Sequence, residues 1–300
     1  MDHVTRIHLK TGKHENRTDL IRYCLYGDQQ YIAIGWSYVY RDREIQSFHE
    51  YYYAVKAKVK RIPSVHNIFW ETREGDLFWT RDLDGYYWIC RATGLAQMEY
   101  SEELDIGAVI PVKAYRFGME VPGQIKASFN RPRGGTSERI SEPAIVEYSK
   151  RKYNELSGIA TYVVEPMKGN LLDNLPPLDL EELVLSYIQL KEDYYLLSGS
   201  IANKSTTVKV EGEFIHRNKE KYQKAVVQVK GRGAPKLDAL AYQEFVNDGF
   251  VVYLFAPEIE NNEKMRNCFV ITPRQLLEFY EEYRSILPES ITVWEDLCKA

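Results

Sequence analysis

The segment Ala225-Val226-Val227-Gln228-Val229-Lys230 is an apolar run that two polar residues interrupt near its end. Its length and its β-branched content predict a buried strand. Because side chains alternate along a strand, Gln228 and Lys230 share one face with Val226. A buried glutamine and a buried lysine are unfavourable unless they pair or bind a ligand. This strand therefore predicts a functional site as well as part of a fold.

A second strand is predicted just before it, over residues 206–215. Lys209, Glu211 and Glu213 share one face of that strand by the same alternation. Glu211 and Glu213 are therefore two candidate carboxylates for one site. The alternative without function places Gln228 and Lys230 on the solvated face of an edge strand, with both glutamates as ordinary exposed carboxylates.

The neighbouring segments predict an α/β core. The apolar stripe of a first helix, with Asp179 as its predicted N-cap, comprises Leu180, Leu183, Val184, Tyr187 and Ile188. The later elements are a strand at 194–197, the two strands above, a helix at 237–247 ending at Gly249, a buried central strand at 250–255 and a strand at 268–271. Thr272-Pro273-Arg274-Gln275 then predicts the start of a last helix, because it combines a Thr cap, Pro at the first helical position and Gln three residues after the cap.

Phosphodiester hydrolysis explains why these residue types occur together. A Mg²⁺ ion takes hard oxygen ligands, which Glu211 as a carboxylate, Gln228 as an amide and Val229 as a backbone carbonyl would supply. Lys230 would orient or help deprotonate the attacking water and offset the charge that develops on the phosphate. Glu213 is the alternative carboxylate ligand.

The first predicted helix offers a fourth catalytic residue. At about 100° per residue, Glu181 lies at the edge of the apolar stripe and Glu182 lies on the far side. Glu181 is therefore the better candidate.

An acidic residue followed by a strand ending in Gln228-Val229-Lys230, within an αβββαβ order, resembles the PD-(D/E)xK nucleases, and in particular the Gln-x-Lys variant of Mrr-like restriction endonucleases. The resemblance covers about residues 179–283. It implies a restriction-endonuclease-like core, a Mg²⁺ cofactor for which Mn²⁺ can substitute, and double-stranded DNA as substrate. The chain departs from the pattern in carrying Glu211 or Glu213 where many members carry Asp, and Glu211 is preferred on the likeness of Val210-Glu211.

The segment Gly231-Arg232-Gly233-Ala234-Pro235-Lys236 follows the motif directly. It lacks the glycine patterns of nucleotide-binding folds. A flexible basic turn beside DNA is expected instead, with Arg232 and Lys236 as DNA contacts.

The first half of the chain predicts a small, strongly curved β structure. The predicted strands lie at residues 31–36, 51–55, 77–80, 86–92 and 108–112. Asp84-Gly85 predicts a hairpin turn between two of them. Trp36, Trp79 and Tyr38 are candidates for stacking on a base, whereas Trp88 is expected to be a core residue.

Two stretches of this half, Gly75 to Thr80 and Gly85 to Gly94, together with Ile34-Gly35-Trp36-Ser37, are similar to the EVE, YTH and PUA-like domains. This looser resemblance covers about residues 6–129. It implies a small β-barrel that captures modified bases, with Trp36 and Trp79 as first candidates for the pocket. Joined to a Mrr-like nuclease, such a domain implies a type IV restriction enzyme.

The expected organisation is a recognition domain at 1–140, a helical linker at 141–177 and a nuclease domain at 178–300, in an α+β or α/β protein. The polar Gly/Pro-bearing stretch near 130–142 marks the joint. The four cysteines lack a C-x-x-C pair, which argues against a zinc knuckle. With a net charge of −4, nucleic acid would be held by local basic segments, and not by bulk charge.

The leading hypothesis is a Mg²⁺-dependent endonuclease that defends against foreign DNA. It is expected to be cytoplasmic, because no signal sequence or membrane-length apolar run occurs, and to act as a homodimer, because one centre cuts one strand. The rivals are a repair or recombination nuclease, and a non-catalytic modified-base binding protein with a degenerate nuclease fold.

Overall fold

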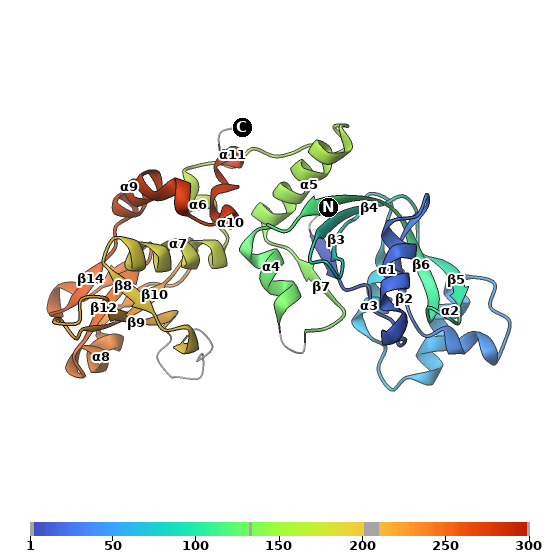
Figure 1. Ribbon diagram of the computed structural model, residues 1–300, viewed down its shortest axis with the longest axis horizontal. Helices are drawn as coiled ribbons and strands as arrows, with labels where there is room; N and C mark the ends of the chain where they lie inside the picture. The colour runs from blue at the N-terminus through green and yellow to red at the C-terminus, as the bar shows by residue number, and fades with distance from the viewer. Residues whose placement is uncertain (1–2, 132–133, 201–209, 299–300) are drawn as a thin grey trace. The chain divides into compact units, whose positions relative to one another are not determined.

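The computed structural model describes residues 3–131, 134–200 and 210–298 (Figure 1). The chain divides into two compact units, Met1–Glu165 and Pro166–Ala300. Each unit combines helices with a β-sheet, so the chain is an α+β protein. None of the helices in the described ranges is long and apolar enough to cross a membrane.

The first unit is built on a curled half-barrel sheet (Figure 1). Its strands are β1 (Val4–Ile7), β2 (Gln30–Ile34), β3 (Leu77–Arg81), β4 (Tyr87–Ala92), β5 (Gln97–Ser101), β6 (Ile106–Gly118) and β7 (Ser137–Ile140). They are ordered β2-β6-β4-β3-β1-β7, and β5 also pairs with β6. Because this order has two ends, the small β-barrel expected from the sequence is corrected to a half-barrel.

Four of the five predicted strands of this unit overlap β2, β3, β4 and β6, although β2 ends at Ile34 and leaves Trp36 outside the strand. β3 and β4 form an antiparallel hairpin, with Gly85 at φ +92° in its turn, as the Asp84-Gly85 pair predicts. The predicted strand at 51–55 is wrong, because this segment lies in helix α2 (Phe48–Lys58). The Ser47 side chain caps α2 by accepting a hydrogen bond from the Glu50 N–H.

Helices cover both faces of this sheet. They are α1 (Arg17–Leu25), α2, α3 (Ser64–Glu71), α4 (Gly123–Asn130) and α5 (Pro143–Ser157), with short 3₁₀ helices η1 (His14–Asn16) and η2 (Ser37–Arg41). α1, α2 and α3 pack on the face that carries Phe78 and Trp88. α5 lies against β1, β4 and β6 and covers Trp79 on the other face.

The predicted helical linker at 141–177 needs correction. Its helical part is α5, which packs on the first sheet and belongs to the first unit. The division falls at Glu165 and Pro166, because the apolar side of α5 is buried against the sheet and cannot serve as a free connector.

The second unit contains a five-stranded sheet in the order β14-β12-β10-β9-β8. Its strands are β8 (Tyr194–Leu196), β9 (Gly212–His216), β10 (Lys224–Val229), β12 (Phe250–Phe255) and β14 (Cys268–Val270), and a small separate pair is formed by β11 (Leu237–Asp238) and β13 (Ile259–Glu260). Its helices are α6 (Leu171–Asn174), α7 (Pro177–Leu190), α8 (Gln243–Asn247), α9 (Pro273–Tyr283), α10 (Glu289–Thr292) and α11 (Glu295–Cys298), with 3₁₀ helices η3 (Ser198–Ser200), η4 (Ala239–Tyr242), η5 (Asn262–Lys264) and η6 (Arg284–Ile286).

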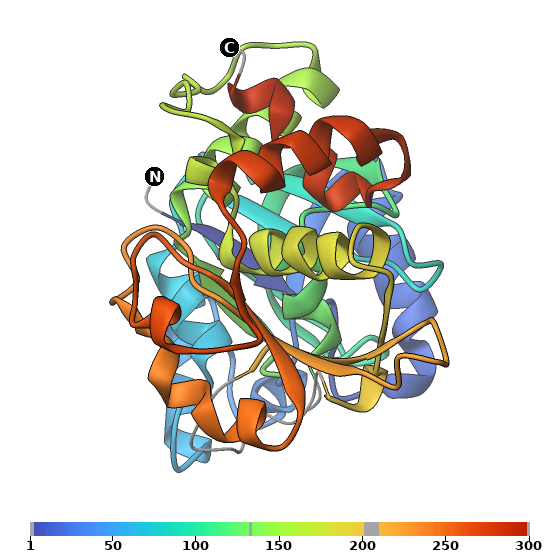
Figure 2. The same cartoon turned by 90° about the vertical axis from the view of Figure 1, so that its left-hand side faces the viewer.

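The strand order and directions of this sheet place β10 and β12 in its interior. β8, β9 and β10 form an antiparallel meander, and β10, β12 and β14 run parallel. Figures 1 and 2 show α7 and α9 on one side of the sheet and α8 on the other. The helices and strands of this five-stranded layer follow the predicted αβββαβ order, to which the chain adds the short strands β11 and β13. The buried central position of β12 is confirmed.

Two predicted elements of this unit differ in extent. The helix expected at 237–247 is divided into β11, η4 and α8. Of the strand expected at 206–215, residues 206–209 lie outside the described residues, and β9 begins at Gly212. The predicted cap of the last helix is confirmed, because Thr272 and Gln275 form a reciprocal capping box at the start of α9.

Candidate functional site

The side chains of Gln228 and Glu211 meet on one face of the second sheet. Gln228 is 1% exposed and lies in β10, which has β9 on one side and β12 on the other. Its Nε2 donates hydrogen bonds to Glu211 Oε1 at 2.9 Å and to the Val229 carbonyl at 3.0 Å. The alternative that places Gln228 on the solvated face of an edge strand is therefore wrong.

The side-chain oxygen of Gln228 is buried and has no hydrogen-bond partner among the described residues. Buried polar atoms nearly always have one. The two ends of an amide are alike in shape, so a 180° rotation would bring Oε1 to the present place of Nε2. It would then face Glu211 Oε1 and the Val229 carbonyl, and the amide oxygen would be repelled by both unless a cation lay between them, while the amide nitrogen would take the place where the oxygen now has no partner. These three oxygens are the ligand types that fit Mg²⁺.

Register separates Glu211 from Glu213. The antiparallel pairing of β9 and β10 sets Glu213 opposite Val226, two residues before Gln228 on the same face. The hydrogen bond from Gln228 goes to Glu211. The geometry therefore favours Glu211 as the carboxylate of this cluster and places Glu213 beside it along the strand.

Tyr242, the last residue of η4, is a neighbour of this cluster that the sequence did not single out. It is buried in the apolar cluster that also contains Val226 and Leu254. Burial, followed by the negative charge of Glu211, raises the pKa of Tyr242 to about 12. Its phenol therefore stays protonated near neutral pH. In the sequence Tyr242 falls within the helix predicted at 237–247, where an aromatic residue indicates core packing and nothing more.

Lys230 directly follows β10. Its backbone N–H donates to the Phe255 carbonyl at 2.7 Å and so continues the ladder between β10 and β12. Strand alternation puts its half-buried side chain on the face of Gln228. The structure buries Gln228 in an inner strand and places Lys230 directly after it, and the shared face of the two side chains stays a prediction.

Glu181 is placed differently. It is half-buried and Glu182 is exposed, as the helical stripe predicts. However, α7 covers the opposite face of the sheet, where a Cβ on Gly212 would lie 3.3 Å from Leu185. A Cβ on Gly231 would lie 3.5 Å from Leu180, so the turn that carries Glu181 passes beside the end of β10. Glu181 is therefore across the sheet from the Gln228 side chain.

The predicted N-cap of α7 is wrong. The helix begins at Pro177 with Pro176 as its N-cap. Asp179 is buried, and its Oδ2 accepts a hydrogen bond of 3.1 Å from Trp294 Nε1. The two Pro residues already start the helix, so Asp179 is not needed as its cap. Its hydrogen bond instead joins α7 to the C-terminal segment.

The described residues contain no group of three or more His, Cys, Asp or Glu side chains placed to hold a metal ion. The oxygens at Gln228 comprise one carboxylate, one amide and one backbone carbonyl, so this cluster is of another kind. These are three oxygen donors of the types that Mg²⁺ accepts, and an ion held by them would need water or substrate for its remaining ligands.

The basic turn after β10 divides into two parts. Arg232 is exposed, whereas Lys236 forms ion pairs with Glu258 at 2.6 Å and Glu260 at 3.0 Å. These carboxylates raise the pKa of Lys236 to about 12 and offset its charge. Arg232 is therefore the stronger candidate for a DNA contact.

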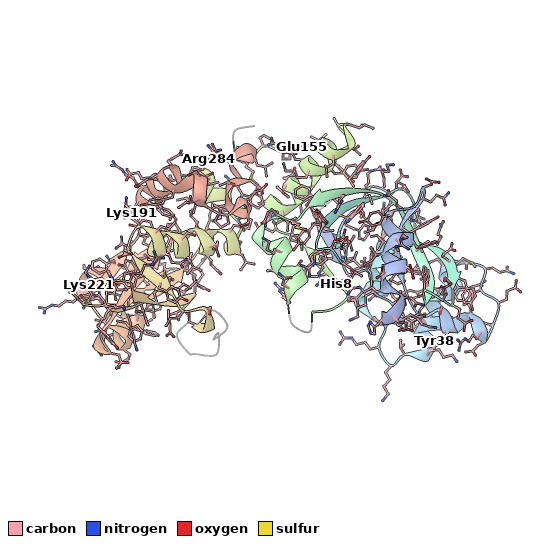
Figure 3. All side chains as sticks on the ribbon, viewed as in Figure 1. His8, Tyr38, Glu155, Lys191, Lys221 and Arg284 are labelled. Atoms are coloured by element: carbon pink, nitrogen blue, oxygen red, sulfur yellow. The ribbon has the colours of Figure 1, made fainter. Side chains whose placement is uncertain are left out.

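The aromatic candidates of the first unit occupy three environments. Trp79 is fully buried and its Nε1 donates to Ser149 Oγ at 2.9 Å, so its predicted place in a base pocket is wrong. Trp36 is half-buried at φ +66°, with its ring edge-on to His66. Tyr38 is 41% exposed on the surface of the first unit (Figure 3). Trp88 is buried, as expected of a core residue.

Comparisons with protein-family models, with curated proteins and with solved structures found no match for this chain.

Proposed function

We propose that the chain is a Mg²⁺-dependent DNA endonuclease of restriction type whose centre comprises Glu211, Gln228 and Lys230. The observation that carries this proposal is the position of the buried Gln228 amide between the Glu211 carboxylate and the Val229 carbonyl, with a side-chain oxygen that has no partner among the described residues. The αβββαβ order, which the resemblance to PD-(D/E)xK nucleases leads one to expect, supports it.

Each residue of the centre has a distinct task. Glu211, the amide oxygen of Gln228 and the Val229 carbonyl would hold Mg²⁺, or Mn²⁺ in its place. The ion, when bound, polarises the scissile phosphate and acidifies a water molecule. The ammonium of Lys230 orients that water and offsets the charge that develops on the phosphate. The protonated Tyr242 lies in the field of Glu211 and gives it a neutral, buried neighbour.

Cleavage of both strands of a duplex requires two such centres, so the proposal includes a homodimer. Defence against foreign DNA and a cytoplasmic location follow from the restriction type. In this proposal the first unit would bind a modified base through Trp36 and Tyr38, because Trp79 is buried. A repair or recombination nuclease would use the same centre on DNA selected by shape.

A non-catalytic binding protein is the second candidate. The observation that favours it is that both N–H groups of the Gln228 amide already have acceptors without any metal. Such a protein would hold DNA and leave it intact.

Plasmid nicking tests the proposal. Unmodified DNA and DNA with 5-methyl- or hydroxymethylcytosine are incubated with the protein in Mg²⁺ or in EDTA. We expect Mg²⁺-dependent cleavage that Lys230→Ala abolishes. The control is Lys224→Ala at the exposed start of the same strand, where the ammonium lies over the Phe250 ring.

Three outcomes would change the proposal. Binding without cleavage of any substrate would leave the binding protein. Cleavage that survives Lys230→Ala would remove the assigned centre. Loss of cleavage in Glu213→Gln but not in Glu211→Gln would move the metal ligand to Glu213.

A further inference from the structure

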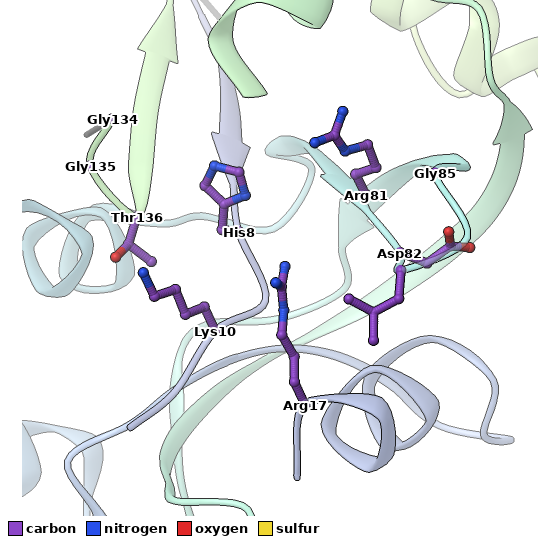
Figure 4. A pocket seen from close by; sticks show the side chains of 10 residues that line it. His8, Lys10, Arg17, Arg81, Asp82, Gly85, Gly134, Gly135 and Thr136 are labelled. Carbon is purple, nitrogen blue, oxygen red and sulfur yellow. The ribbon is translucent and has the colours of Figure 1, made fainter. Parts of the chain in front are cut away.

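A cavity of about 370 Å³ lies in the first unit and is rich in cationic side chains. Figure 4 shows Lys10, Arg17 and Arg81 pointing into one space beside His8. Its wall is completed by Asp82, Leu83, Gly85, Gly134, Gly135 and Thr136. The cavity is within the size range of small-molecule sites, about 300–1,000 Å³.

Separate elements bring these cations together. Lys10 follows β1, Arg17 starts α1 and Arg81 ends β3. Arg17 Nε donates to the Leu9 carbonyl at 3.3 Å, and among the described residues no acceptor is found for its two Nη groups. Arg81 is held through Nη1, which donates to Asn130 Oδ1 at 3.0 Å. The fold therefore holds two guanidinium groups in place around one cavity.

The acidic residue of the lining does not neutralise them. Both carboxylate oxygens of Asp82 point to donors in the protein: Oδ1 accepts from the Tyr86 N–H, and Oδ2 accepts from Trp88 Nε1 and Tyr26 Oη. Asp82 is buried. These hydrogen bonds hold Asp82 in the turn between β3 and β4, and one carboxylate against the three cations of the lining leaves the cavity with a positive excess.

The pKa of His8 also reflects this positive environment. Burial, and then the charges of Arg6, Arg17, Arg81 and Lys10, lower the pKa of His8 to about 4. The imidazole is therefore neutral near pH 7, with a nitrogen that can donate to a ligand. Like charges this close repel one another, and a bound anion would relieve that repulsion.

We infer that this cavity binds the phosphate group of a nucleotide through Lys10, Arg17 and Arg81. Arginine groups match the geometry of phosphate oxygens in pairs, and three cations suit an anion that carries up to two charges better than a single carboxylate. Gly134 and Gly135 also line the cavity and add no side chain to it. The site is independent of the cleavage centre at Gln228, and the phosphate has two sources: a free nucleotide or the 5′ end of a DNA strand.

Calorimetric titration of the full chain in EDTA tests this inference, because no cleavage occurs without a divalent ion. The probes are deoxyadenosine 5′-monophosphate, deoxyadenosine, and a short single DNA strand with or without a 5′-phosphate. We expect the monophosphate to bind and the nucleoside to bind about ten-fold more weakly or not at all. Tighter binding of the phosphorylated strand than of the mononucleotide would identify a strand end as the source, and equal binding would identify the free nucleotide.

The decisive variant is Lys10→Gln with Arg17→Gln, which we expect to weaken binding of the monophosphate about ten-fold or more. Its matched control is Lys58→Gln with Lys126→Gln, which removes two exposed cations elsewhere in the same unit. If the double variant unfolds, Lys10→Gln alone serves, because Lys10 is exposed. Unchanged binding in the folded cavity variant, or nucleoside binding as tight as that of the monophosphate, would overturn the inference.

Discussion

The Nε2 of Gln228 donates to Glu211 Oε1 at 2.9 Å, so a neutral amide lies against a half-buried carboxylate. Replacing that amide by a second carboxylate tests whether the cluster holds a cation. In Gln228→Glu without divalent ions, two carboxylates repel or one takes up a proton. We expect the free energy of unfolding to fall by about 1–3 kcal/mol, the usual loss for a buried polar group without its partner.

Mg²⁺ should restore the stability of Gln228→Glu, because an ion that binds the native state alone adds about 2.7 kcal/mol at a hundred times its dissociation constant. Urea unfolding in EDTA and in excess Mg²⁺ measures both effects. Gln29→Glu adds the same charge at an exposed position and should show neither. Equal stability of Gln228→Glu in the two buffers would contradict a cation site between these oxygens.

The hydrogen bond from Trp79 Nε1 to Ser149 Oγ joins β3 to α5. In Trp79→Phe the ring stays apolar and the donor is lost, and in Ser149→Ala the acceptor is lost. We expect Ser149→Ala to destabilise the first unit by about 1 kcal/mol, and Trp79→Phe to destabilise it further because the smaller ring also leaves a cavity. Combined in a double-mutant cycle, the two should show a coupling energy of about 0.5–1 kcal/mol in urea unfolding. A coupling of zero would mean that the bond does not contribute to stability.

The capping box at the start of α9 supplies a prediction about the second unit. Thr272 Oγ1 accepts from the Gln275 N–H, and Gln275 Oε1 accepts from the Thr272 N–H. Thr272→Ala should therefore lower the free energy of unfolding by about 1 kcal/mol. Thr272→Ser retains the hydroxyl and should stay near the wild type. Equal losses in the two variants would show that the methyl group, and not the cap, stabilises this end.

The sequence predicts this cap correctly because the interaction is local: both partners lie within four consecutive residues. The strand predicted at 51–55 fails for the opposite reason. Tyr51-Tyr52-Tyr53-Ala54-Val55 has the composition of a strand, but Tyr51, Ala54 and Val55 are buried at the spacing of a helix, and Ser47 caps it. The composition of this segment predicts a strand, whereas the spacing of its buried residues predicts a helix. The packing of α2 in the core favours the helix.

The candidate site likewise divides into residues that one strand places and residues whose place depends on the pairing of two strands. Alternation along β10 is enough to place Gln228 and Lys230 on one face. Selecting Glu211 over Glu213 requires the register between β9 and β10, which a single strand does not encode. Trp79 is a third case: Phe78 packs on one core and Trp79 meets α5, so both faces of β3 are buried and alternation cannot separate core from surface.

His66 predicts the pH dependence of stability in the first unit. It is fully buried beside Tyr51, and burial lowers its pKa from 6.5 to about 4. Between these two values the unfolded chain binds a proton that the folded chain does not, so the free energy of unfolding falls as the pH is lowered from 6.5 to 4. The slope from one such histidine is at most about 1.4 kcal/mol per pH unit, and His8 acts in the same direction and range.

His66→Gln keeps a polar side chain without an imidazole, so it should show a shallower loss of stability between pH 6.5 and 4 than the wild type. Urea unfolding at several pH values within this range measures the two slopes. The matched variant is His14→Gln, because His14 is exposed and its imidazole is solvated in both the folded and the unfolded chain. His14→Gln should follow the wild-type slope. If His66→Gln also follows it, the folded chain must take up the proton at His66, and the neutral, buried imidazole beside Tyr51 would be disproved.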